Sequence, residues 1–173
     1  MPTARPDAGA ALVEGKLYVI GGRHTDGTAL ASNEAFDVFK DEWSAKKDIP
    51  TARWDVAAAS VGRRIYAIGG TRFTKTQEVV ARNEQYETED DVWTRRSDWT
   101  RPRFGAAAAT LDQGVFVIGG SKEFGDAGAL ASNDRYDPRT DLWAERAPMP
   151  TARAHAAAVA RGGSLYVIGG AAA

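Results

Sequence analysis

A unit of about 50 residues repeats along the whole chain and limits the possible folds more than any other feature. Its first marker is a short segment ending in arginine. Copies lie at 1–5, 49–53 and 149–153, with a degenerate copy at 99–103. The steps between copies are 48, 50 and 50 residues. A period of this length indicates a propeller or solenoid, in which one supersecondary unit is copied and packed against its neighbours.

Two further markers keep the same phase as the first. A glycine pair follows a short apolar run in every unit, and an aromatic residue stands seven positions before a tryptophan. The glycine pairs are Gly21-Gly22, Gly69-Gly70, Gly119-Gly120 and Gly169-Gly170; the aromatic pairs are Phe36 and Trp43, Tyr86 and Trp93, and Tyr136 and Trp143. Together the markers divide residues 1–173, a single repeat domain, into units 1–48, 49–98 and 99–148 and a half unit, 149–173.

Each complete unit predicts four strands. The apolar run before the glycines, such as 17–20, lacks alternation and fits a strand buried on both faces. The alanine-rich stretch before it, such as 57–59, favours helix by propensity. Because these runs are short and lead through a glycine-containing turn into the next strand, we predict an innermost strand instead. The third strand carries the Phe36-type aromatic residue, and the fourth starts at the tryptophan. The sequence therefore predicts an all-β chain of 14 strands.

This pattern resembles the Kelch repeat over essentially the whole chain. The resemblance implies a Kelch-type β-propeller, whose blades are four-stranded antiparallel sheets ordered outward from a central channel. Here it would be partial, with three complete blades and a two-stranded half blade. Kelch propellers generally have six or seven blades, so two interpretations stay open. The chain is a piece of a longer propeller, or two chains close a ring. Either way, open blade faces predict self-association.

Composition excludes several classes of protein. The chain has no cysteine, two histidines and a net charge of −1, with charges of both signs interspersed. These numbers argue against a disulfide scaffold, a thiolate or histidine-rich metal site, and binding to nucleic acid. No apolar run is long enough to span a membrane, so we expect no membrane association. No signal peptide is recognised, which predicts a cytoplasmic protein if the chain is complete.

Residues that recur in phase are predicted to be structural. The glycine pairs fit no phosphate-binding motif and are expected to allow positive φ at strand ends. Trp43, Trp93 and Trp143 are expected to pack between blades. The repeated arginines are expected to bind backbone carbonyls, an anion site being the minor alternative. The acidic run 87–91 lacks the spacing of an EF-hand and predicts a solvated hairpin tip.

Residues that break the repeat are the candidates for ligand binding. In an antiparallel four-stranded blade, the loops after the second and fourth strands emerge at the same end. We expect these loops, which also hold Asp7 and Lys122, to expose aromatic and charged side chains at that end of the blades. We also expect that truncation of Trp54 leaves the fold intact. The predicted site residues are Arg23, His24, Trp54, Asp55, Arg72, Phe73, Phe104 and His155.

The sequence favours a binding module over an enzyme. Exposed aromatics beside Arg, His and Asp suit a protein or peptide partner, and we predict no cofactor, metal site or catalytic residue. The alternative is a carbohydrate-directed Kelch protein, either a glycan binder or a sialic acid mutarotase-like enzyme. The resemblance also includes the galactose oxidase branch, which needs a cysteine, and the specifier branch, which needs Glu-x-x-x-Asp-x-x-x-His. The chain has neither.

Overall fold

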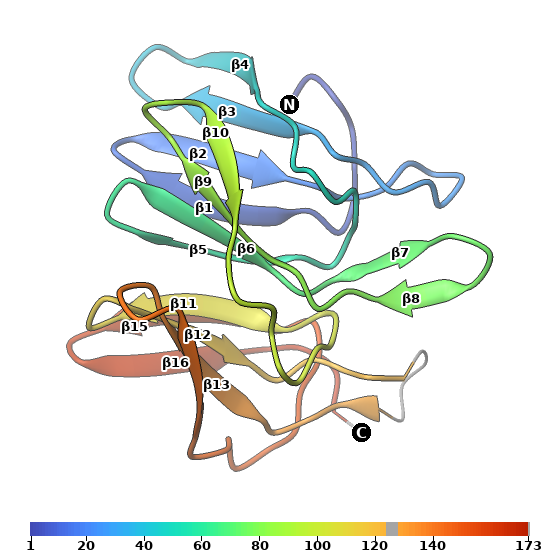
Figure 1. Ribbon diagram of the computed structural model, residues 1–173, viewed down its shortest axis with the longest axis vertical. Helices are drawn as coiled ribbons and strands as arrows, with labels where there is room; N and C mark the ends of the chain where they lie inside the picture. The colour runs from blue at the N-terminus through green and yellow to red at the C-terminus, as the bar shows by residue number, and fades with distance from the viewer. Residues whose placement is uncertain (124–127, 173) are drawn as a thin grey trace.

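A computed structural model of the chain describes residues 1–123 and 128–172, and the strands in this part form radially arranged antiparallel sheets (Figure 1). Blade 1 consists of β1 (Gly9–Val13), β2 (Lys16–Ile20), β3 (Asn33–Asp37) and β4 (Glu42–Lys46). Blade 2 consists of β5 (Ala57–Val61), β6 (Arg64–Ile68), β9 (Asn83–Glu87) and β10 (Val92–Arg95). Blade 3 consists of β11 (Ala107–Leu111), β12 (Gly114–Ile118), β13 (Asn133–Asp137) and β14 (Leu142–Arg146). A two-stranded half blade, β15 (Ala157–Arg161) and β16 (Ser164–Ile168), follows.

The alanine-rich stretches form the innermost strands, as predicted. Strands β1, β5, β11 and β15 contact one another in sequence. Small side chains let these strands approach closely, and Ala57 and Ala59 are buried. The Ser60 hydroxyl donates to the Leu12 carbonyl at 2.9 Å, and the Thr110 hydroxyl donates to the Ser60 carbonyl at 2.7 Å. Polar side chains therefore also join neighbouring inner strands.

The hydrophobic core lies between blades and repeats its composition at each junction. Between blades 1 and 2, Tyr18 and Ile20 pack with Ile65 and Tyr86. Between blades 2 and 3, the equivalent cluster contains Tyr66, Ile68, Val115 and Tyr136. The tyrosine ring centroids are 5.8 Å apart in the first cluster and 5.4 Å apart in the second. The continuous apolar strand β6, which lies between the two junctions, is thus buried on both faces.

The predicted number of 14 strands is wrong, because the described part of the chain contains 16. The additional strands are β7 (Thr71–Phe73) and β8 (Gln77–Val79), in what the sequence indicated was a loop after Gly70. The residues at the start and end of this segment are β-branched or aromatic, and Thr71 exchanges both backbone hydrogen bonds with Trp54. The hairpin projects from blade 2 beyond the end of the sheet (Figure 1).

Two smaller predictions also need correction. The outer strands β4, β10 and β14 begin one residue before the tryptophan. The turn before β12 is formed by Asp112 and Gln113, both with positive φ, and Gly114 is the first residue of that strand. A side chain at Gly114 would collide with the guanidinium of Arg135. This glycine therefore makes room for a neighbour and does not shape the turn.

The repeated arginines bind backbone carbonyls, as predicted, but they also form ion pairs that we did not predict. Arg53 is buried, donates to the carbonyls of Gly69 and Ala67 at 2.8 and 2.9 Å, and pairs with Glu84. Arg103 makes the corresponding pair with Asp134 at 2.8 Å. These acids follow the repeated asparagine of the third strand, so their recurrence was visible in the sequence. The arginine and acid together fix the second and third strands of a blade.

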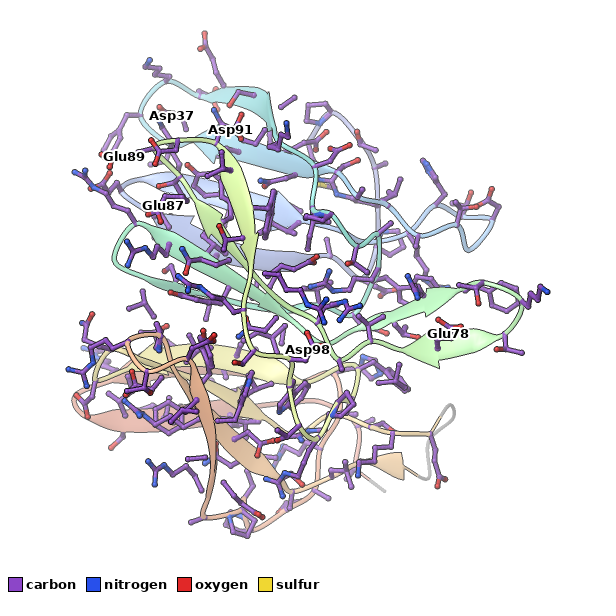
Figure 2. The ribbon with its side chains drawn as sticks, viewed as in Figure 1. Asp37, Glu78, Glu87, Glu89, Asp91 and Asp98 are labelled. Carbon is purple, nitrogen blue, oxygen red and sulfur yellow. The ribbon has the colours of Figure 1, made fainter. Side chains whose placement is uncertain are left out.

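The acidic run forms the tip of the β9–β10 hairpin, as predicted, and Figure 2 shows Glu87, Glu89 and Asp91 at the blade end opposite Glu78. Glu89 pairs with Arg63. Asp91 has a structural role that the sequence did not reveal. Its Oδ1 accepts hydrogen bonds from the Tyr86 hydroxyl at 2.6 Å and the Lys47 amide at 2.7 Å. It thereby connects blade 2 to the end of blade 1.

The two terminal blade faces expose apolar side chains at positions that are buried elsewhere. In the half blade, Tyr166 is 52% and Ile168 is 62% exposed, whereas Tyr18 and Ile20 are 3% and 0% exposed. At the other end, Leu17 is half-buried, whereas Ile65 is 0% exposed. These faces repeat the two surfaces that pack together at each internal junction.

Candidate functional site

A cavity of about 770 Å³ lies at the end of the blades where the loops after the second and fourth strands meet. Its walls come from all three complete units and the half unit. The projecting β7–β8 hairpin supplies one wall, and Figure 2 shows Glu78 on this hairpin. The lining residues are Arg23, Asp26, Gly27, Thr28, Ala29, Pro50, Thr51, Ala52, Trp54, Asp55, Arg72, Phe73, Gln77, Phe104 and His155.

The structure brings together seven of the eight predicted site residues. His24 lies outside the cavity, on the exposed turn of the 21–33 loop. Lys122 is exposed and also outside it, while Asp7 contacts the cavity through Arg23. The structure therefore places these seven residues around one cavity, and their role in binding stays a prediction.

Asp55 and His155 line the cavity and form what we term its floor, and both occupy one backbone position that is repeated in each unit. This position lies two residues after the repeated arginine and holds Asp7, Asp55, Gly105 or His155. All four residues have positive φ, between 53° and 60°. The Asp55 amide donates to the Asp7 carbonyl, and the His155 amide donates to the Gly105 carbonyl, both at 2.7 Å. This left-handed position turns the chain into the innermost strand and links neighbouring units.

The prediction that Trp54 and Phe104 are exposed is wrong. Each side chain borders the cavity, yet each residue is only 6% exposed. The reason is local: Trp54 pairs with Thr71, and Phe104 pairs with Ser121, in isolated antiparallel bridges. These bridges hold both aromatic residues beneath the loops that follow the glycine pairs. The exposed aromatic residue of the cavity is Phe73, at 63%.

The chain's family follows from comparison with known proteins. The model of the KLHDC2/KLHL20/DRC7 Kelch-repeats domain matches residues 1–172. The chain belongs to the Kelch-repeat family. The solved structure of YjhT has the same fold, with a TM-score of 0.81 and 18% identity over 97% of this chain and 59% of YjhT. This Kelch domain thus spans less than two thirds of that relative, and no curated protein matches its sequence.

Both arginines of the Kelch cavity are paired with carboxylates. Arg23 Nε lies 2.6 Å from Asp7 Oδ2, and its guanidinium lies 5.9 Å from the centre of the Trp54 ring. Arg72 Nε lies 3.1 Å from Glu78 Oε2, along the β7–β8 hairpin. Each arginine is about 40% exposed and remains accessible from the cavity. Their positive charges are nevertheless balanced within the protein.

Asp55 and His155 form the remaining titratable pair. Asp55 Oδ1 lies 3.7 Å from His155 Nδ1, beyond hydrogen-bond distance, and the imidazole packs 6.2 Å from the Phe104 ring. The Asp55 side chain is 13% exposed. Burial raises the pKa of its carboxyl to about 6, and the Asp7 carboxylate adds to this effect, while His155 and Arg23 oppose it. The cavity floor thus holds a carboxyl that titrates near neutral pH.

Several lining residues were missed because no sequence signal indicates them. Asp26, Thr28 and Gln77 lie in loops of differing length, and only the fold brings them to one cavity. Within residues 1–123 and 128–172, no cluster of three or more His, Asp or Glu side chains could hold a metal ion. The same residues include no helix long and apolar enough to cross a membrane.

Proposed function

We propose that this Kelch domain binds a protein or peptide partner in the cavity at the end of its blades. The observation that carries the proposal is the convergence of seven repeat-breaking residues on one cavity of about 770 Å³. Its wall includes the exposed Phe73 ring on a projecting hairpin. An exposed aromatic anchor beside arginines is typical of protein interfaces.

A carbohydrate-directed function is supported less well. Sugar-binding sites need an accessible aromatic face, and Trp54 and Phe104 are both 6% exposed. Phe73, on the β7–β8 hairpin, is the one accessible phenylalanine or tryptophan ring among the described lining residues. We therefore propose a binding role without catalysis. Glycan binding would appear as retention on a glycan array.

The test is selection of peptides against the immobilised domain from a displayed library. A selected peptide, labelled with a fluorophore, would then be titrated by anisotropy. We expect Phe73→Ser to weaken its binding by about tenfold or more with an unchanged melting temperature. Phe39→Ser is the matched control, because Phe39 is 86% exposed and lies outside the cavity. Failure to select any peptide, or equal weakening by both variants, would contradict the proposal.

A further inference from the structure

Pairing within the cavity leaves one carboxyl without a hydrogen bond. Among its charged lining groups, Arg23 pairs with Asp7 and Arg72 pairs with Glu78. The Asp26 carboxylate accepts a hydrogen bond from the Thr28 amide at 2.8 Å. Within the described residues, the Asp55 carboxyl has no hydrogen bond. The imidazole of His155 lies 3.7 Å away and would be its ion-pair partner only in the protonated form.

A carboxylate held in this way is available to a cation from outside the protein. A half-buried ion without a hydrogen bond is costly, and a charged donor that reaches it forms a strong hydrogen bond. The nearby arginines, Arg23 and Arg72, donate to Asp7 and Glu78 and not to Asp55. The exposed ring of Phe73 lines the same cavity and suits the aliphatic stem of a long basic side chain.

We propose that the cavity recognises a basic side chain, lysine or arginine, of the bound peptide, with Asp55 accepting its charged hydrogen bond. This inference rests on the proposed peptide-binding function and names the chemistry of its ligand. The guanidinium of Arg23, which lies over the Trp54 ring, shows that this wall already packs against a cation.

The proposal also gives the pH dependence of binding. The titratable and charged groups that act on Asp55 are His155, whose Nδ1 lies 3.7 Å from the carboxyl, Asp7 and Arg23. Below about pH 6 the carboxyl is protonated and accepts a cation poorly. Above it, the carboxylate forms and can accept a hydrogen bond from the cation. Binding should therefore strengthen as pH rises through about 6 and should release a proton there.

The test uses three pentapeptides, Gly-Ser-X-Ser-Gly, acetylated and amidated at their ends, in which X is arginine, its neutral isostere citrulline, or glutamate. Each is titrated into the ¹⁵N-labelled chain and followed by NMR at about pH 7.5. We expect the arginine peptide to bind about tenfold more tightly than the other two, with shifts at cavity residues. Asp55→Asn should abolish this preference, since asparagine tolerates positive φ and keeps the side-chain size.

The control is Asp90→Asn, which removes one negative charge at an exposed carboxylate outside the cavity. It should retain the preference. Calorimetry at about pH 6 in two buffers of different ionisation enthalpy should show proton release by the wild type and none by Asp55→Asn. A preference for glutamate, equal binding of arginine and citrulline, or no binding of these three peptides would overturn the inference. Peptides selected by display would still support the broader function, and failure of that selection would remove it.

Discussion

The indole Nε1 of Trp93 donates a hydrogen bond to the main-chain carbonyl of Lys47 at 2.8 Å, joining the outer strand of blade 2 to the end of blade 1. The next junction repeats the contact, with Trp143 Nε1 donating to Ser97 at 3.0 Å. Asp141, like Asp91, accepts an amide hydrogen bond across the junction. The recurring tryptophan is therefore a link between blades as well as an apolar group.

We expect Trp93→Ala to destabilise the chain by about 3 kcal/mol, because it removes both the packed ring and the hydrogen bond to Lys47. The matched control is Trp43→Ala. Trp43 occupies the same position in blade 1 and makes no hydrogen bond to another blade within the described residues. It should cost about 1 kcal/mol. Urea denaturation followed by circular dichroism measures both changes in the free energy of unfolding. Equal destabilisation by the two variants would contradict a stabilising role for the hydrogen bond from Trp93 to Lys47.

Arg53→Met is expected to destabilise the chain by about 3–5 kcal/mol, because it leaves the buried Glu84 carboxylate without its cation. Arg153→Met provides the comparison. Arg153 donates to the Gly169 carbonyl at 2.8 Å but is half-buried and has no acidic partner among the described residues. Its loss should cost less than about 1 kcal/mol. Similar unfolding midpoints for the two variants would disprove the importance of the buried ion pair.

Burial of Trp54 reverses the expectation drawn from sequence. Because its side chain packs beneath the 71–73 strand, we expect Trp54→Ala to lower stability by about 3 kcal/mol. Phe73→Ser, at an exposed position of the same cavity, should leave the melting temperature within a few degrees of wild type. Differential scanning calorimetry distinguishes them. A Trp54→Ala variant as stable as Phe73→Ser would show that the tryptophan is not part of the core.

Asp55 should make stability fall as pH rises. Its ordinary pKa is 3.8 and its pKa in the folded chain is about 6, so the folded state binds the proton more tightly. The contribution is fully present below about pH 4 and is lost as pH rises through about 6. We expect Asp55→Asn to be more stable than wild type by about 2 kcal/mol at pH 7.5, with the difference disappearing near pH 4. A stability difference between Asp55→Asn and wild type that stays constant over this pH range would contradict a raised pKa of Asp55 in the folded chain.

The exposed terminal faces should cause the isolated chain to self-associate. Tyr166 and Ile168 of one copy offer the side chains that Tyr18 and Ile20 use at an internal junction. We expect concentration-dependent association in sedimentation velocity, reduced by Ile168→Glu and unchanged by Phe73→Ser. A wild-type chain that remains monomeric at high concentration would show that these faces do not mediate association.

Much of this fold could be predicted because its repeat places equivalent residues in equivalent strands. The alanines of β5 and the apolar run of β6 were assigned correctly for this reason. The same logic failed where units differ. The β7–β8 hairpin forms in a segment that is two residues shorter in the first unit, and the sequence indicated only a loop there. The burial of Trp54 depends on its bridge to Thr71, a tertiary contact that residue type does not reveal. The repeated acids, Glu84 and Asp134, were present in phase and could have been found.

The left-handed backbone shared by Asp7, Asp55, Gly105 and His155 restricts which residues can occupy this repeated position, two copies of which line the cavity. Glycine, asparagine, aspartate and histidine enter this conformation most readily, and β-branched or bulky residues pay a steric penalty. Each unit can therefore contribute an acid, an amide, an imidazole or an empty space at this position. New binding specificity at the floor would therefore have to come from these few residue types, whereas the surrounding loops are free to vary.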